Sequence, residues 1–458
     1  MKRLMFVFGL FYTVSANAQM PKTLSAADKV YGLSKFWQEV NYNFIYLDKV
    51  NRRAWDSSFR ALIPIVQQTE NDYQYYRELQ KFCALLKDGH TNVYMPQGTA
   101  YETMTTMFGE YRFFIENIDG KAIIVRTNLS KKDEVPLGSE VIEVNGMPTR
   151  SYINEQVAPY ISSSTDYVLE DWSINRLLQG LPGDSFHISI KRPKGDVIKL
   201  NLAHTRTTEK EVYPDFEKDR ELLDFKWYDG QVAYVALNSF GDPKIDTLFT
   251  NILPELYKAK SLIIDLRYNG GGSTNVGSEI MQYLTHDKVL YGSRYMSRQH
   301  IPSFKAWGKY TKAADTLNNE WQKKSMLSYL DQYYYHFDYS PDTIKLNAPR
   351  IVVPTVILLG HNTASAAEDF LIFADNQKHM TKIGTNSFGS TGQPYLFDLP
   401  GGGLARVCTK KDTYPDGREF VGYGIKPDIE VKQTLSDYIQ KRDPVLLKAL
   451  EYLKTKKK

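Results

Sequence analysis

The sequence predicts a multidomain α+β protein, and three successive patterns of apolar residues support this. From residue 25 to about 94, apolar residues recur at helical spacing, as in Val30, Leu33, Phe36, Trp37 and Val40. From about 111 to 203, short alternating strands are separated by turn pairs such as Asn145-Gly146. From about 225 onward, strands and helices alternate, which is typical of an α/β domain. We therefore expect an N-terminal helical domain, a β-rich module and an α/β core.

Length and composition fit this organisation. The chain has 458 residues, of which 42% are apolar and 24% charged, and these values are those of a globular protein with several domains. The formal net charge of +4 is small and is spread along the chain. It implies neither nucleic acid nor a membrane surface as a partner.

The N-terminus predicts an export signal. Lys2 and Arg3 precede an apolar stretch from Leu4 to Val14, and Ala16-Asn17-Ala18 is a small-x-small cleavage site. The apolar stretch is shorter than the roughly 20 residues that a membrane span needs. We expect cleavage of residues 1–18 after Ala18, a periplasmic or secreted protein, and no integral membrane segment.

Cysteine and histidine usage gives no metal or disulfide framework. Cys83 and Cys408 are the two cysteines; they either form one bridge or are buried separately as thiols. The eight histidines are scattered, without a His-Glu-x-x-His motif. We expect catalysis, if any, to need no cofactor.

The individual elements can be placed from periodicity and turn residues. The helical region ends near Leu86, where Asp88-Gly89-His90-Thr91 supplies a helix stop. The β-rich module has expected strands at 112–116, 122–126, 140–144, 185–191 and 197–202. The core has expected strands at 232–237, 262–266 and 355–359 and helices at 245–258, 276–284 and 366–376. Residues 287–348 form an aromatic-rich insertion, interpreted as a subdomain near the site, although packing of its aromatic residues against one another is the simpler explanation of its composition.

Ser365 is the first candidate for chemistry. It lies between an apolar strand and an amphipathic helix, where helix N–H groups favour negative charge. Ser365-x-x-Glu368 is also a capping box, which would give the serine a purely structural role. Residues 262–272 form an apolar strand that runs into Gly270, Gly271 and Gly272, and such a turn can present N–H groups to an oxyanion or be merely flexible.

Together these segments resemble peptidase family S41, the family of C-terminal processing proteases and the tricorn core. The resemblance rests on "DLRYNGGG" at 265–272, "ASAAE" at 364–368, "IGTNSFG" at 383–389 and "GIKPDI" at 424–429. It implies a core of the ClpP/crotonase type at 208–458. Residues 136–146 resemble a turn of PDZ domains, so the domains expected are a helical one at 19–97 and a PDZ-like one at 98–207.

The family resemblance also implies roles for particular residues. Processing proteases carry a lysine base after "phe-gly", where this chain has Ser390, so a Ser-Lys dyad is not expected. The segment 85–91 resembles the histidine motif of tricorn-like members and implies His90 as general base, with His361 as the fallback. Glu419 is expected to orient His90, with Asp88 as the alternative. The N–H groups of Gly271 and Ala366 are expected to form the oxyanion hole.

The sequence thus predicts an exported serine peptidase with Ser365 as nucleophile. Its substrate would be a peptide or unfolded protein, whose C-terminus the PDZ-like module could bind by strand addition. The alternative is a catalytically inactive S41-like protein that binds a peptide or another ligand.

Overall fold

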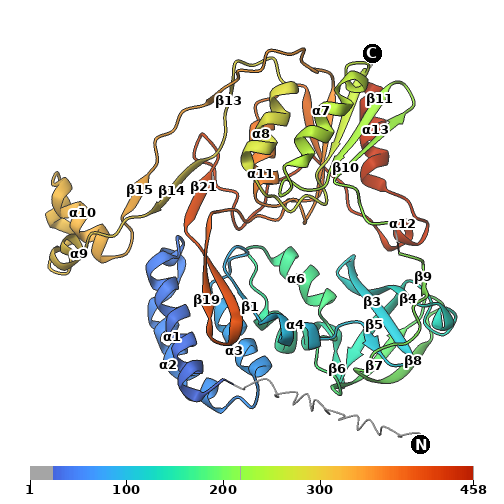
Figure 1. Cartoon of the computed structure of the whole chain (residues 1–458), viewed down its shortest axis with the longest axis horizontal. Helices are drawn as coiled ribbons and strands as arrows, with labels where there is room; N and C mark the ends of the chain where they lie inside the picture. The colour runs from blue at the N-terminus through green and yellow to red at the C-terminus, as the bar shows by residue number, and fades with distance from the viewer. Residues whose placement is uncertain (1–23, 217, 457–458) are drawn as a thin grey trace, which may run out of the picture.

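The computed structural model describes residues 24–216 and 218–456, so the predicted export signal lies outside the described residues. Figure 1 shows an α/β core at the top, a bundle of helices at the lower left, a β-rich module at the lower right and an arm that extends to the left. This arrangement confirms the multidomain α+β prediction. Within the described ranges, no helix is both long and apolar enough to cross a bilayer.

The N-terminal helices pack around an apolar and aromatic core. They are α1 (Ala26–Asn43), α2 (Arg52–Gln68) and α3 (Asp72–Ala84), after which the chain turns toward His90. Each begins at a capping side chain, Ser25, Asn51 or Asn71, that accepts a first-turn N–H. Trp55 stacks on Phe82 at 3.9 Å between ring centroids, which joins α2 to α3.

The helices end close to the expected stop near Leu86, and the segment after His90 forms a strand that was not expected. Residues Asn92–Tyr94 form strand β1, which pairs with β20 (Gly403–Cys408), and β20 pairs in turn with β19 (Pro394–Leu399). A strand of three residues carries too little pattern to be seen in sequence, and its partner lies near the other end of the chain. This small sheet brings the segment after His90 to the C-terminal part of the core.

The β-rich module contains the strands that were expected. It also contains helices that were not expected. Its main sheet has the order β2-β3-β4-β5-β7-β8. These strands are Met107–Phe108, Tyr111–Ile118, Lys121–Asn128, Ser139–Val144, Ser185–Lys191 and Val197–Ala203. Helix α6 (Asp166–Asn175) lies between β5 and β7 in the chain and contacts the α/β core.

The core is a six-stranded sheet with helices on both faces. The order β10-β11-β12-β17-β18-β22 is parallel except for the β10–β11 pair. The strands are Leu223–Tyr228, Val232–Leu237, Ser261–Asp265, Thr355–Leu359, Met380–Gly384 and Ile429–Glu430. Leu262 and Ile264 face helices α7 (Lys244–Leu256), α8 (Thr274–Tyr283) and α11 (Ala366–Ala374), whereas Ile263 faces α13 (Pro444–Thr455). Buried on both faces, the central strands read as apolar runs.

The insertion forms an arm rather than a subdomain beside the core. Its ribbon consists of β13 (Val289–Leu290), β14 (Arg294–Arg298), β15 (Tyr334–His336) and β16 (Asp342–Thr343), with β14 also paired to β21 (Lys410–Thr413). Helices α9 (Pro302–Gly308) and α10 (Glu320–Tyr329) form its tip, which projects away from the core in Figure 1. Its aromatic residues do pack against one another, as the composition suggested.

Candidate active site

Ser365 occupies a strained turn between β17 and α11. Its backbone angles are φ 57° and ψ −123°, whereas an ordinary N-cap residue has an extended backbone with negative φ. A non-glycine residue in this region costs of order 1–3 kcal/mol, and such strain is concentrated at functional sites. A sharp strand-to-helix turn of this kind presents a nucleophile in other hydrolases. Ser365 stays partly exposed, while every residue of α11 behind it is buried.

Glu368 joins the Ser365 turn to the segment that follows β18. Ser365 and Glu368 form the predicted capping box, in which the Ser365 N–H donates to Glu368 Oε2 at 3.1 Å. The other oxygen, Oε1, accepts from Ser387 Oγ at 2.5 Å and from the Gly389 N–H at 2.8 Å. Burial raises the pKa of Glu368 to about 8. The capping box is therefore part of the site's construction and does not exclude a nucleophile.

The glycine loop after β12 lies directly against Ser365. A Cβ added to Gly271, whose φ is +98°, would lie 2.7 Å from Ser365 Cβ and 3.0 Å from the Ala366 nitrogen. The structure thus brings Gly271 and Ala366 together, as expected. The Gly271 N–H, however, donates to Asn269 Oδ1 at 2.9 Å, so this donor already has an acceptor. In the described part of the chain, no hydrogen bond occupies the Ala366 N–H.

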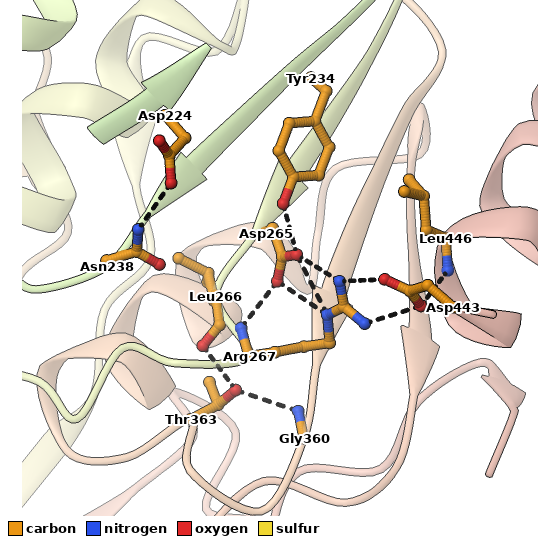
Figure 2. A network of polar contacts seen from close by, with 10 residues as sticks. All are labelled: Asp224, Tyr234, Asn238, Asp265, Leu266, Arg267, Gly360, Thr363, Asp443 and Leu446. Carbon is orange, nitrogen blue, oxygen red and sulfur yellow. Dashed lines mark hydrogen bonds and ion pairs between the residues drawn. The ribbon is translucent and has the colours of Figure 1, made fainter. Parts of the chain in front are cut away.

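A buried polar network fixes the ends of β12 and β17 (Figure 2). Arg267 donates to Asp265 and to Asp443, the residue that caps α13. Thr363 Oγ1 accepts from the Gly360 N–H at 3.0 Å and donates to the Leu266 carbonyl at 2.9 Å. This bridge holds the loop before Ser365 against the strand that leads into the glycines. The network therefore sets the relative position of the Ser365 turn and the glycine loop.

His90 is buried next to Ser390. Its Nδ1 lies 2.7 Å from Ser390 Oγ, so the residue in the place of the processing-protease lysine is the one that contacts the imidazole. Burial lowers the pKa of His90 to about 3, and the positive charges of Arg406 and Lys410 act in the same direction. The imidazole is therefore neutral at physiological pH, as a general base must be.

Neither expected carboxylate contacts the His90 ring. Glu419 is paired with Lys411 and lies 3.9 Å from Lys49, and the bond to Lys411 lowers the pKa of its carboxyl group. Asp88 is buried and accepts from Thr91 Oγ1 at 2.6 Å, and burial raises its pKa. The expectation that one of them orients His90 through its ring is not met. The sequence around Glu419 does not indicate that Lys411 and Lys49 lie beside its carboxylate.

The β-rich module covers one side of the Ser365 turn. Val168 of α6 packs with Ala364 and Phe388, and Tyr167 donates to the Ser387 carbonyl at 2.6 Å. His361, the fallback base, has its Nδ1 2.5 Å from Asp171 of α6. His361 therefore engages the module, which makes it a poor candidate for the base.

Ser365 and His90 are linked through a chain of contacts. It runs from the Ser365 N–H to Glu368, from Glu368 to Gly389, and from the adjoining Ser390 to His90. Among the side chains of residues 24–216 and 218–456, no hydrogen bond joins Ser365 Oγ directly to His90. Catalytic contacts are often long in a substrate-free state and tighten on binding.

Sequence reasoning missed two contributors to this site. The sequence analysis used Ser390 only to argue against a lysine base and did not predict that its hydroxyl contacts His90. Glu368 was seen as a cap and not as a bridge, because its second partner lies in a separate segment. Cys83 and Cys408 are both free and buried, on either side of Thr91. The structure groups no three potential metal ligands anywhere in its described ranges.

Comparisons with known sequences match this chain to one peptidase family. A profile described as Peptidase family S41 matches residues 231–431. A carboxyl-terminal-processing protease of Picosynechococcus sp. is 24% identical over 93% of this chain and 88% of its own length. The carboxy-terminal processing protease CtpA of Bacillus subtilis is 22% identical over 86% of this chain and 73% of its own length.

A likeness to solved structures supports the same fold. Mature CPAF complexed with lactacystin has a TM-score of 0.65 and 14% identity, over 94% of this chain and 97% of that one. A putative peptidase from Parabacteroides merdae has a TM-score of 0.50 and 16% identity, over 94% and 97% of the two chains. At these identities the likeness concerns the fold.

The fold is that of a multidomain α+β protein that places a serine at a strand-to-helix turn. The region 231–431 matches the model of peptidase family S41, and the likeness to the two processing proteases extends over most of the chain. The family predicted from the sequence is thereby confirmed, and a peptidase is the activity that these relationships support.

Proposed function

We propose that this protein is an exported serine peptidase that cleaves peptide bonds through an acyl-enzyme on Ser365. The observation that carries the proposal is the Ser365 turn, with its positive φ at the N-terminus of a buried helix and Gly271 pressed against it. A capping serine needs neither the strain nor the adjacent glycine. A nucleophile needs both exposure of its hydroxyl and room beside it for a carbonyl group.

His90 is proposed as the general base. A neutral imidazole whose Nδ1–H donates to Ser390 Oγ presents the Nε2 lone pair, which can accept the Ser365 proton during attack. The imidazolium then returns this proton to the leaving amine, and a water molecule hydrolyses the acyl-enzyme by the same route. We assign Ser390 as the residue that fixes the tautomer, in place of Glu419 or Asp88.

The oxyanion hole is proposed at the start of α11. The Ala366 N–H lies at the positive end of the helix and is the first donor. The Gly271 N–H can be the second donor by sharing its hydrogen between Asn269 Oδ1 and the oxyanion. The absence of a side chain at Gly271 leaves the space that the substrate carbonyl requires.

The substrate is proposed to be a peptide or an unfolded protein. The two curated relatives are named for processing carboxyl termini, and the module at 98–207 would bind such a terminus by strand addition if it acts as a PDZ domain. The contact of α6 with Ala364 and Phe388 would couple this binding to the Ser365 turn. Export is inferred from residues 1–18 alone.

A catalytically inactive binding protein is the competing function. It is favoured by two observations: the Gly271 N–H is already bonded, and the His90 ring has no carboxylate partner among the described residues. Both proposals predict a folded protein with a peptide site, and they differ in the reactivity of Ser365.

Labelling with a fluorophosphonate separates the two functions. The mature chain from Gln19 is treated with the reagent, and the adduct is followed by intact mass in wild type, Ser365→Ala, His90→Ala and the matched control His361→Ala. We expect one adduct on wild type, none on Ser365→Ala, and labelling at least about 100-fold slower in His90→Ala. His361→Ala should label like wild type. An unlabelled, folded wild type would establish the binding protein instead.

A further inference from the structure

The tip of the arm, residues 301–330, has no apolar core of its own. Within it, the buried residues are Gly308, Ser325 and Ser328. A Cβ added to Gly308 would lie 1.9 Å from the Ser325 carbonyl oxygen, so α9 and α10 touch through small residues. This contact brings the helices together but removes little apolar surface from water. The large side chains of the tip therefore remain at least partly exposed to water.

Aromatic and aliphatic side chains cover the outer surface of this tip. The exposed fractions are 48% for Trp307, 46% for Trp321, 79% for Tyr310 and 76% for Leu317. The two tryptophan rings lie 4.9 Å apart and form one continuous patch with part of Phe304. Short helices with an exposed apolar face gain stability from a surface that covers this face.

The tip carries an excess of positive charge. Residues 301–330 contain five lysines and two carboxylates, Asp315 and Glu320, which gives a local formal charge of +3 that the composition of the whole chain does not reveal. Lys324 lies over the Phe304 ring at 4.8 Å, with its stem along the aromatic surface. A mixture of tryptophan, tyrosine and lysine on one short helical surface suits an interface between hydrocarbon and anionic headgroups.

The root of the arm holds the tip outward. Arg298 donates to the carbonyl groups of Asn41 and Tyr42 at the end of α1 and is paired with Asp331. His300 stacks on Tyr42 with ring centroids 4.2 Å apart. These contacts fix residues on both sides of the tip to the helical bundle, and Figure 1 shows α9 and α10 beyond them, at the extremity of the molecule.

We propose that the arm tip docks the protein on an anionic membrane surface. At roughly 200 Å² for an aromatic side chain, Trp307, Trp321 and Tyr310 together expose about 350 Å². A stable protein interface takes about 800 Å² from each partner, so the patch is small for a protein and sufficient for shallow insertion between headgroups. The lysines supply the attraction to anionic lipid. Docking is independent of the proposed peptidase activity.

The test is co-sedimentation of the mature chain with lipid vesicles. Vesicles of phosphatidylethanolamine and phosphatidylglycerol are compared with vesicles of phosphatidylcholine, and tryptophan quenching by brominated lipid reports insertion. The variants are Trp307→Ser/Trp321→Ser and Lys309→Glu/Lys312→Glu. Trp227→Ser is the matched control, because this tryptophan is 40% exposed on β10 of the core.

We expect binding to the anionic vesicles, reduced about ten-fold or more by either double substitution and unchanged in Trp227→Ser. Ser365→Ala should bind like wild type, which separates this result from any failure of the peptidase proposal. Unfolding by urea checks that the tip variants stay folded. Absence of binding, or binding that both tip variants retain, would overturn the proposal. The proposal would also be overturned if the protein does not bind vesicles but self-associates, and if the tryptophan substitutions abolish this self-association.

Discussion

Replacing Gly271 by alanine tests the geometry around Ser365 most directly. The glycine has φ +98°, and an added Cβ would lie 2.7 Å from the Ala364 carbonyl oxygen and from Ser365 Cβ, and 3.0 Å from the Ala366 nitrogen. Two of these three atoms belong to the backbone and cannot rotate away. The Ser365 turn or the glycine loop must therefore shift.

The expected cost has two parts. An alanine at this φ loses of order 1–3 kcal/mol in backbone strain. Relieving the contacts adds about 1–3 kcal/mol, as overpacking does in a tight site. We expect a total loss of about 3 kcal/mol in the free energy of unfolding. A displacement of Ser365 by about 1 Å should also slow its labelling by a fluorophosphonate about 100-fold. This loss is expected even though alanine at position 271 keeps the backbone N–H.

Gly270 supplies the matched control. A Cβ at Gly270 would meet no atom within 4 Å, so Gly270→Ala makes the same chemical change one residue away. Urea unfolding and the rate of fluorophosphonate labelling are measured for both variants and wild type. Gly270→Ala should stay within about 0.5 kcal/mol and about three-fold of wild type. The reasoning is refuted if Gly271→Ala matches Gly270→Ala in both measurements.

Three further predictions concern the groups around His90 and Glu368. Ser390→Ala should slow labelling of Ser365 about ten-fold or more and alter the tautomer of His90, seen in its ¹⁵N shifts, whereas a purely structural serine would leave the tautomer unchanged. Arg406→Gln removes a positive charge that helps to lower the pKa of His90 to about 3, so the pKa of His90 should rise. The acid limb of the pH profile of kcat/KM should then move to higher pH. An acid limb that does not move would contradict His90 as the general base. Because burial raises the pKa of Glu368 from 4.5 to about 8, the folded protein holds a proton that the unfolded chain has released, and its contribution to stability is complete below about pH 4.5 and is lost as pH rises through about 8. Urea unfolding between these pH values should show a fall of up to about 1.4 kcal/mol per pH unit that is absent in Glu368→Gln.

The contacts of Glu368 and Ser390 show how the Ser365 turn and the segment 387–390 are held together. The Glu368 carboxyl group accepts three hydrogen bonds, one from the Ser365 N–H and two from the segment 387–389. Ser390 continues this segment and contacts His90. A displacement of the segment 387–390 would therefore move both the nucleophile turn and the imidazole. Helix α6 holds the same segment through Tyr167 and Thr165.

The sequence by itself determined the longer strands and helices of the core and their order. Apolar periodicity placed β11 and β17 without error and located α8 and α11 within a few residues, because helices and buried strands leave patterns over many positions. The four motifs at 265–272, 364–368, 383–389 and 424–429 together predicted the family. They also indicated that Gly271 and Ala366 would lie near each other, which the structure confirms.

The tertiary structure alone decided which side chains meet. The pairing of β1 with β20, the contact of His90 with Ser390 and the two partners of Glu368 all join segments distant in sequence. No local pattern encodes such contacts, because they depend on how separately formed elements pack. Glu419 illustrates the same limit: it was chosen as the acid nearest to the position expected from the family, and the fold places Lys411 and Lys49 beside it instead. The arm tip gives a further example. Its aromatic residues are visible in the sequence, but their exposure to water follows only from the position of the arm in the fold.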